Sequence, residues 1–347
     1  MSSLHEGQSR RKSLAAAKRS LLNKYLQGEL ASSTCAQTIP RRPEGPAPLS
    51  HAQERLWFLE QLAPGSGAYH IPAALRLCGS LSVQKLRQAF SEVARRHEVL
   101  RTTFTLVEGR PMQAVQPSNE VAVPVVDLST LREEKREGEG MRQLQEQATR
   151  PFDLERGPLW RVGLWYLGHL GEEEPGVEDV YLLLFVCHHL IFDGWSVQVL
   201  MRELVALYRA YCRDQPTPLP ELPIQYADYA TWQQQQGERI EREISYWRGR
   251  LAGALDILDL PTDRVRPLEP SHRGATYHFT FSPSLTADLK QLSRRRGLTL
   301  FTVLLAVFNA LLHRLSGQRD LCVGTPAASR IPVETEGLIG CFVNTLV

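Results

Sequence analysis

The feature that most constrains the fold is an unbroken apolar run, "VYLLLFVC", at residues 180–187. A strand exposed to water on one face alternates polar and apolar residues, whereas a strand covered on both faces is apolar throughout. Most residues of this run are β-branched, aromatic or large aliphatic types that suit a strand. The run therefore predicts a central strand of a sheet that is covered on both faces.

Helices with one apolar face flank this strand in the sequence. Residues 83–98 follow a candidate N-cap at Ser82, and a second helix is expected after a cap at Ser196. The residues expected to point inward are Leu86, Phe90, Val93, Ala94 and His97 in the first helix and Val197, Leu200, Leu204 and Tyr208 in the second. The segments "RTTFTLV" and "MQAVQP", joined across "EGRP", predict a hairpin. Strands thus alternate with helices, which indicates the α/β fold class.

Two proline clusters suggest how the chain is divided. Prolines 40, 43, 46 and 48 favour an extended linker, and "PTPLPELP" at 216–223 is the best internal boundary. The predicted parts are a basic helical segment at 1–38, a proline-rich linker at 39–48, a first lobe at 49–215 and a second lobe at 216–347. In the second lobe we expect helices near 238–252, 284–296 and 298–316, and strands near 276–282 and 320–324.

Charge and cysteine usage exclude several functions. Residues 1–42 carry eight Lys/Arg and two Asp/Glu, whereas the whole chain has a net charge of only +2, so the basicity is local. No basic stripe with interleaved aromatic residues runs through the rest, which argues against nucleic acid as a partner. The six cysteines show no paired short spacing of the kind that binds zinc, and we expect no metal.

The location expected from the sequence is the cytoplasm. Scattered cysteines in a chain of this size are typical of free thiols in a reducing compartment. Lys18 and Arg19 interrupt any apolar core of a signal peptide, and the most apolar later run, "LTLFTVLLAVFNALLH", is short for a bilayer. We therefore expect no membrane association.

The segment "FVCHHLIFDGWS" at 185–196 carries the candidate chemistry. If the strand continues through His188 and His189, their side chains point to opposite sides of the sheet and cannot share one metal. One imidazole can then face a cavity near the start of a helix, a placement that suits acid/base work on a developing oxyanion. The alternative is a pair of structural histidines at a strand end. Asp193 and Gly194 are expected to form the turn into the helix.

At this point a family resemblance is clear. "HHLIFDG" at 188–194 resembles the HHxxxDG signature of condensation domains of nonribosomal peptide synthetases, and of the wider chloramphenicol-acetyltransferase-like acyltransferases. Four further stretches are similar to condensation-domain motifs and occur in the same order: "LSHAQERLWFLEQL" (49–62), "RRHEVLRTTF" (95–104), "YADYATW" (226–232) and "IGCFVNTLV" (339–347).

The resemblance implies a fold and an activity. The fold would be two chloramphenicol-acetyltransferase-like α/β sandwich lobes in a V arrangement, with the second lobe incomplete because the chain stops at Val347 within the fifth motif. Donor and acceptor carrier proteins would deliver their substrates on phosphopantetheine arms to opposite mouths of a tunnel. The acceptor amine would attack the donor thioester, forming a peptide bond, and no cofactor would be bound directly.

The same resemblance assigns roles to individual residues. His189 matches the catalytic histidine, and His188, Asp193 and Gly194 complete the signature. Asp193 is expected to be a buried anion paired with Arg101 of "VLRTTF", and Gly194 to supply conformational freedom and close backbone approach. Trp195 and Asn344 are assigned to the support of the site. Tyr226, Asp228 and Trp232 are expected to pack the junction of the lobes rather than to act in catalysis.

The sequence also suggests partner domains for this chain and leaves two alternative functions open. An adenylation domain is expected downstream, and the basic helix at 11–29 is a candidate docking segment for an upstream synthetase or a solvated leader. The intact histidine pair argues against heterocyclising relatives. An L-configured donor is favoured, and epimerase-like and lipid-starter variants stay open. Two other functions stay open: acyl transfer from coenzyme A to an alcohol or free amine, and a catalytically silent recruitment module or truncated remnant.

Overall fold

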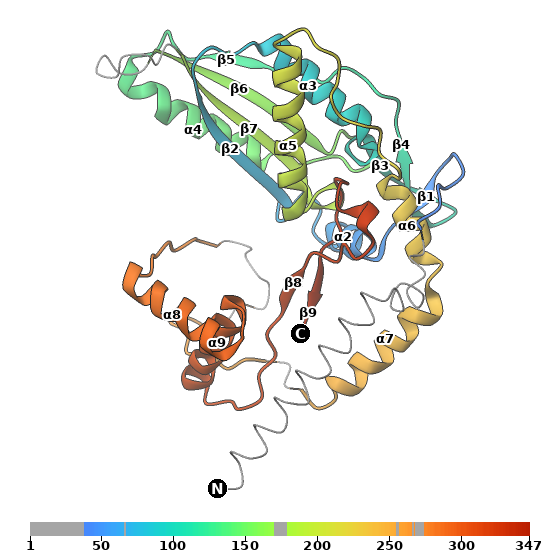
Figure 1. The fold of residues 1–347 in the computed structure, drawn as a ribbon, viewed down its shortest axis with the longest axis vertical. Helices are drawn as coiled ribbons and strands as arrows, with labels where there is room; N and C mark the ends of the chain where they lie inside the picture. Colours follow the sequence, from blue (N-terminus) through green and yellow to red (C-terminus); the bar gives the residue numbers. More distant parts are fainter. Residues whose placement is uncertain (1–37, 66, 170–178, 255–256, 266, 268–273) are drawn as a thin grey trace, which may run out of the picture.

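The computed structural model describes residues 38–65, 67–169, 179–254, 257–265, 267 and 274–347. The helix predicted at residues 11–29 lies outside these described residues. Figure 1 shows the arrangement of the described elements: a sheet flanked by helices, and a set of helices and one short hairpin beyond it.

The sheet has four strands in the order β2-β7-β6-β5. The bounds of the strands are His70–Cys78 for β2, Val125–Asp127 for β5, Trp160–Gly168 for β6 and Val180–His188 for β7. Strand β7 runs antiparallel to both of its neighbours, β2 and β6, whereas β5 runs parallel to β6. The apolar run at 180–187 is therefore an inner strand of the sheet, as predicted.

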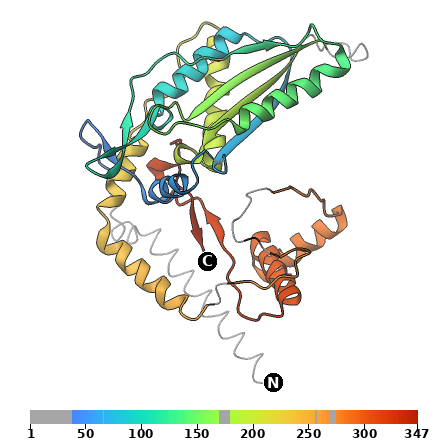
Figure 2. The same ribbon diagram turned by 180° about the vertical axis from the view of Figure 1, so that it is seen from behind.

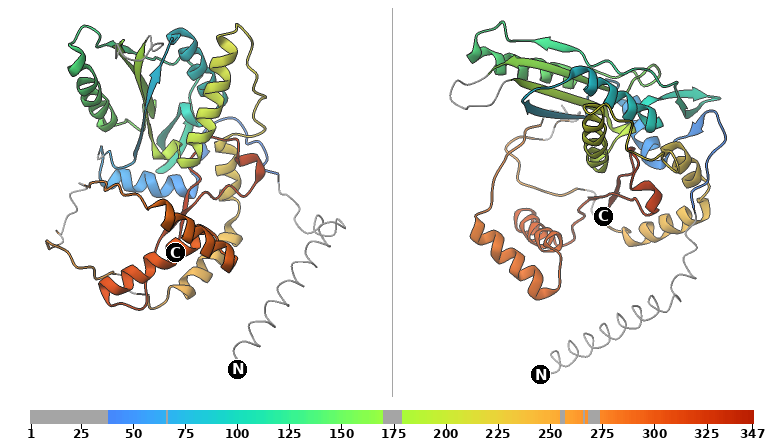
Figure 3. Two further views of the ribbon diagram at one scale, coloured as in Figure 1. Left: turned by 60° about the vertical axis from the view of Figure 1, so that its left-hand side comes forward. Right: turned by 45° about the horizontal axis from the view of Figure 1, so that its top comes forward.

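Alternate side chains of β7 enter two different cores. Leu183, Phe185 and Cys187 belong to the large core beneath α3 (Val83–Arg96) and α5 (Gly194–Tyr211). Leu182, Leu184 and Val186 belong to a smaller core beneath α4 (Glu133–Thr149). Figure 2 shows α4 lying over the sheet from behind, and the left view of Figure 3 separates the three layers. The prediction of a strand covered on both faces, and with it the α/β fold class, is confirmed.

The two predicted helices of the first half are present, with one shifted start. The α3 helix is capped by the Ser82 side chain, and all five residues predicted to point inward are buried. The α5 helix begins at Gly194 rather than after Ser196, because Asp193 is its N-cap and accepts a hydrogen bond from the Ser196 N–H. Leu200 and Leu204 are buried as predicted, whereas Val197 and Tyr208 are only partly buried.

The predicted hairpin is also present. It consists of β3 (Thr102–Val107) and β4 (Arg110–Val115), which pair antiparallel, and β1 (Ala47–Pro48) adds a third strand beside β4. The 3-10 turn η1 (Glu98–Arg101) joins α3 to β3. Near the start of the described chain, α2 (His51–Leu62) is capped by Ser50, and Ser50 and Gln53 form a complete capping box.

Beyond residue 216 the helix predictions hold better than the strand predictions. The helices are α6 (Tyr226–Gln234), α7 (Gly237–Arg250), α8 (Pro283–Arg296) and α9 (Leu300–Ser316), and the strands are β8 (Thr325–Ala327) and β9 (Asn344–Leu346). The strands expected near 276–282 and 320–324 are wrong: residues 276–281 form no strand, and β8 begins only at residue 325. Strand assignment requires a hydrogen-bonded neighbour, and no described segment pairs with these residues.

The helix pair α8 and α9 lies apart from the sheet (Figure 1). Much of the apolar surface of α9 is exposed, at Phe301, Leu304, Val307, Phe308, Leu311 and Leu315. Among the described residues no single helix is long and apolar enough to cross a bilayer, although α8 and α9 together meet that test across a bend of 107°.

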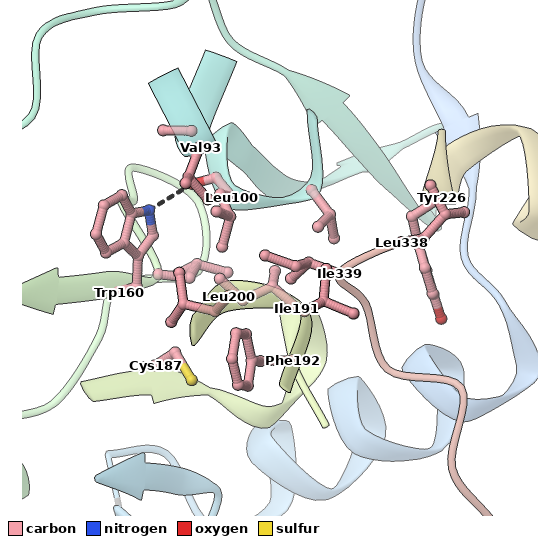
Figure 4. Packing of buried hydrophobic residues seen from close by; sticks show 14 of the residues in the cluster. Val93, Leu100, Trp160, Cys187, Ile191, Phe192, Leu200, Tyr226, Leu338 and Ile339 are labelled. Atoms are coloured by element: carbon pink, nitrogen blue, oxygen red, sulfur yellow. Dashed lines mark hydrogen bonds between the residues drawn. The ribbon is translucent and has the colours of Figure 1, made fainter. Parts of the chain in front are cut away.

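The chain then returns to the first half of the molecule. Leu338, Ile339 and Phe342 are buried within the large core that also contains α3, α5 and β7. Figure 4 shows Ile339 lying beside Ile191, and Leu338 next to Tyr226. The core around the histidine motif is thus completed by residues about 150 positions further along the chain.

Candidate functional site

The histidine pair lies where β7 ends. The strand stops at His188, and His189 begins the 3-10 turn η2 (His189–Ile191), so the expectation that strand geometry continues through both histidines is wrong. The reason is a local cap: Nδ1 of His188 accepts a hydrogen bond of 3.1 Å from the Leu190 N–H. The two imidazoles nevertheless have entirely different surroundings.

His188 is held on both ring nitrogens. Since its Nδ1 is an acceptor, its Nε2 carries the proton and lies 3.5 Å from Oε2 of the buried Glu60. This hydrogen bond is the largest cause of a lowered pKa of Glu60, whose Oε1 also accepts from the Gly65 N–H. His188 is 1% exposed and fully engaged, which makes it a structural member of the motif.

His189 is only partly buried, and one of its ring nitrogens has no partner among the described residues. Its backbone N–H donates to the Tyr69 carbonyl, and its Nδ1 lies 3.7 Å from Sγ of Cys341. Burial, and to a smaller extent the charge of Asp193, raises the pKa of the Cys341 thiol to about 12, so this neighbour is neutral. The contact recorded for the ring is this one through Nδ1, and nothing in the described part of the chain hydrogen-bonds Nε2 of His189.

Asp193 is the centre of a buried hydrogen-bond network. Its carboxylate accepts from the backbone N–H and hydroxyl of Ser196, at 2.9 and 2.7 Å, and from the Phe342 N–H at 3.0 Å. The guanidinium of Arg330 lies 3.0 and 3.3 Å from its two oxygens. A carboxylate with this many donors is satisfied, which agrees with the expectation of a buried structural anion.

The prediction that Arg101 forms the ion pair with Asp193 is wrong. Arg101 donates to the Gln116 carbonyl at 2.5 Å and lies 3.7 Å from Glu98, because it sits at the end of η1 beside the β3–β4 hairpin. Arg330 takes its place in the ion pair. Burial lowers the pKa of Arg330, and the Asp193 charge opposes this effect. Arg330 also donates to the carbonyls of Thr335 and Leu338, each at 2.6 Å.

The sequence contained a weak signal for Arg330. The residue stands in "AASRIP", an otherwise uncharged stretch before the fifth motif. Its guanidinium lies 4.0 Å from the centre of the Phe342 ring and so fixes the segment that follows. An isolated arginine between small and apolar residues is a candidate for a buried ion pair, but the sequence does not say with which carboxylate.

Gly194 lacks the backbone role expected for it, whereas the supporting roles of Trp195 and Asn344 stay predictions. Gly194 was expected to supply conformational freedom and close backbone approach, and this prediction is wrong. Gly194 is the first residue of α5, and its φ is outside the left-handed region. An added Cβ would meet no atom within 4 Å. Trp195 is 39% exposed and donates its Nε1–H to the Glu336 carbonyl. Asn344 is exposed in β9, and its Oδ1 accepts from the Thr345 N–H.

Tyr226 ties three motifs together, in line with the packing role expected for it. Its hydroxyl lies 2.7 Å from Oγ of Ser50 and donates to the Cys341 carbonyl at 2.5 Å. Ser50, Tyr226 and Cys341 come from the stretches at 49–62, 226–232 and 339–347. The carbonyl that Tyr226 holds belongs to the residue whose thiol faces His189, so this bond helps to place the site.

Comparison with known proteins agrees with this architecture. The family model named "Condensation domain" matches residues 44–347. One of the proteins that make up the linear gramicidin synthase of Brevibacillus parabrevis is 44% identical over 323 residues, which are 92% of this chain and 4% of that protein. Phosphinothricin tripeptide synthetase PhsC of Streptomyces viridochromogenes is 43% identical over 312 residues, 89% of this chain and 28% of that protein.

Solved structures of similar domains have the same fold as this chain. The X-domain from teicoplanin biosynthesis is 31% identical with a TM-score of 0.75, covering 88% of this chain and 65% of that one. The first condensation domain of the CDA synthetase is 24% identical with a TM-score of 0.70, covering 88% and 70%.

The layered α/β fold, with a histidine pair where its inner strand ends, agrees with these matches. The chain belongs to the condensation domain family, and it spans only a small part of the length of the synthetases that it matches.

Proposed function

We propose that the chain is a condensation domain that forms a peptide bond between two carrier-bound substrates in nonribosomal peptide synthesis. The observation that carries the proposal is the state of His189. Its Nε2 has no partner among the described residues, its Nδ1 meets a neutral thiol, and the neighbouring His188 and Asp193 are fully engaged. A proton-transfer step needs an imidazole with a ring nitrogen free to bind the substrate, held in place by neighbours whose own hydrogen bonds are complete.

In the proposed reaction the acceptor amine attacks the carbonyl carbon of the donor thioester. A C–N bond forms, the C–S bond breaks, and the proton lost by the amine passes through His189 to the departing thiolate. An α-amine has a pKa near 8 and is partly neutral at pH 7.5, so simple deprotonation would remove only about 1 kcal/mol of the barrier. His189 therefore acts by positioning the amine and accepting its proton as the tetrahedral intermediate forms.

The surrounding residues have supporting roles in this proposal. Asp193 and Arg330 hold the start of α5 and the return segment in place. Gly194 leaves open space beside the motif, which a substrate can use. Trp195 and Asn344 are exposed, and in this proposal they support the site.

The partners in this proposal are a donor and an acceptor carrier protein, each with a phosphopantetheine arm, and an adenylation domain that loads them. The support is that the similar curated proteins are large synthetases, and that a solved four-domain nonribosomal peptide synthetase has the same fold over 89% of this chain. We place the reaction in the cytoplasm, since the cysteines recorded in the described part of the chain are free thiols.

The test is single-turnover condensation between two carrier proteins loaded with aminoacyl thioesters. His189→Ala is expected to lower the rate by ~10²–10⁴, the usual loss on removing a general base. His278→Ala is the matched control, because His278 is exposed and distant in sequence from the motif. Full activity of the His189→Ala variant would contradict the proposal.

A recruitment module without catalysis is the second candidate. It is favoured by the likeness to the teicoplanin X-domain, a structure of which was solved in complex with OxyB. If the wild-type chain binds loaded carriers but forms no product, and His189→Ala binds them equally well, recruitment becomes the function. Product formation from soluble coenzyme A thioesters without carriers would instead favour a free-standing acyltransferase.

A further inference from the structure

A cavity of about 850 Å³ lies at the outer side of β6, between the segment at 116–126 and the end of α4. We propose that this cavity binds a small amphipathic anion, with a carboxylate or phosphate head and an apolar or aromatic body. Its volume is within the range of about 300–1,000 Å³ that is typical of small-molecule sites.

The cavity is distinct from the histidine motif. Neither His189 nor Asp193 nor Cys341 lines it. The residue of β7 that does line it, Leu184, precedes His188 by four positions, or about 13 Å along a strand. The proposal therefore stands independently of the proposed condensation reaction.

The charge of the lining favours an anion. Four arginines line the cavity, Arg101, Arg150, Arg156 and Arg161, against a single acidic residue, Glu120. Such a surplus of one sign in a partly enclosed space attracts ligands of the opposite sign. Arginine is also the side chain best suited to two-pronged recognition of carboxylate and phosphate.

The two arginines that are not fully exposed lack a closely bound carboxylate. Arg161 donates to the backbone carbonyls of Gln147 and Arg150, and Arg101 donates to the Gln116 carbonyl. Arg101 has a long ion pair with Glu98, at 3.7 Å, and Arg161 has no ion pair within the described structure. These carbonyls satisfy N–H groups but do not neutralise a full positive charge.

Two further observations indicate that Arg161 and Arg101 lack a close negatively charged partner. Burial, and next the nearby charge of Arg150, lowers the pKa of Arg161 to about 10. Nε of Arg101 is buried with no hydrogen-bond partner in the described structure. Buried donors are usually satisfied, so an orphaned arginine nitrogen at a cavity wall is a recognisable feature of a ligand-binding site.

The apolar part of the lining suits the body of such a ligand. Trp160 and Trp165 contribute rings, and their N–H groups are already used: Trp160 donates to the Leu100 carbonyl (Figure 4) and Trp165 to Oε1 of Gln143. The indoles therefore offer faces and edges rather than hydrogen bonds. Leu184 and Val162 add aliphatic surface to the lining.

The experiment is a calorimetric titration of the full chain with 1-naphthyl phosphate, 1-naphthoate and the uncharged 1-naphthol. We expect saturable binding of at least one of the two anions, and binding of 1-naphthol at least about tenfold weaker. Whichever anion binds more tightly identifies the head group. Equal binding of 1-naphthol and both anions, or no saturation by either anion up to about 1 mM, would overturn the proposal.

Variants then locate the site. Arg161→Met and Arg101→Met keep most of the side-chain volume and are each expected to weaken anion binding about tenfold. Arg142→Met is the control, because Arg142 is exposed on α4 and pairs with Glu139 away from the cavity. If Arg161→Met does not fold, the double variant Arg150→Met/Arg156→Met, at two exposed positions, replaces it. Anion binding that is insensitive to all of these arginines would place the ligand elsewhere, for example on the exposed surface of α9, and would overturn the proposal.

Discussion

The guanidinium of Arg330 lies 3.0 Å from the carboxylate of Asp193, although 137 residues separate them in the sequence. Their side chains are 2% and 3% exposed, so each charge depends on the other for neutralisation. Replacing one member, as in Arg330→Met or Asp193→Asn, is expected to lower the free energy of unfolding by about 3–5 kcal/mol.

Urea unfolding of the two single variants and the double variant checks this pair. The double variant should be less destabilised than the sum of the singles, because no lone charge remains buried. Arg142→Met, at an exposed ion pair with Glu139, is the control and should change stability by less than about 1 kcal/mol. An effect of Arg330→Met no larger than the control would show that the ion pair contributes nothing to stability.

Gly340 is packed directly against Tyr226. A Cβ at this position would lie 2.0 and 2.5 Å from two atoms of the Tyr226 ring, and the ring is fully enclosed by the core. Gly340→Ala is therefore expected to destabilise the fold by about 1–3 kcal/mol through overpacking. Gly337→Ala, three residues earlier, meets no atom within 4 Å and serves as the control in the same denaturation measurement. Equal stabilities of the two variants would contradict the close packing.

Gly194 gives the opposite expectation for stability. Its added methyl group meets nothing within 4 Å, and alanine is a better helix former than glycine at the start of α5. Gly194→Ala should keep the melting temperature or raise it slightly, while lowering the condensation rate, because the methyl occupies space beside the motif. A variant with normal stability and normal rate for small and large acceptors would mean that no substrate uses this space.

The pH dependence of stability has an identifiable contributor in Glu203. This buried carboxylate of α5 loses hydration, which alone would raise its pKa, but hydrogen bonds from His97 and Arg96 outweigh burial and lower the pKa to about 2. Because the folded-state pKa is below the unfolded value of about 4.3, Glu203 stabilises the fold above that pH. The contribution is lost as the pH falls from about 4.3 to 2.

The measurement compares the wild type with Glu203→Gln by urea unfolding between pH 3 and 7. The difference in the free energy of unfolding should be constant above about pH 5 and should shrink below pH 4.3. Taking the difference between the two proteins removes the titration of the other carboxylates. A difference that stays constant down to pH 3 would mean that Glu203 is not strongly stabilised in its charged form.

Local features were predictable because their determinants lie within a few residues. The run at 180–187 specified an inner strand by composition alone, and Ser82 with the apolar face of α3 specified a helix and its start. The start of α5 was missed by three residues, because aspartate and serine are both good N-caps. Only the structure shows that the Asp193 carboxylate accepts the Ser196 N–H.

Long-range partners were not predictable for a physical reason. Any buried arginine could neutralise Asp193, and sequence spacing does not distinguish Arg101 from Arg330 once the chain turns back on itself. The same holds for Glu60, whose contact with His188 joins residues 128 positions apart. The strands expected beyond residue 275 failed for a related reason, because a strand depends on a partner that its own sequence does not name.

The return of residues 338–342 to the large core bears on how this chain is made. A ribosome finishes α5 at Tyr211 long before it reaches Phe342, and at about 5–20 residues per second the delay is roughly 7–26 s. During that interval the nascent chain holds Asp193 without its cation and a core without its last apolar side chains. Translation speed between these two points, and chaperones that shield the waiting surface, should therefore control the yield of folded protein.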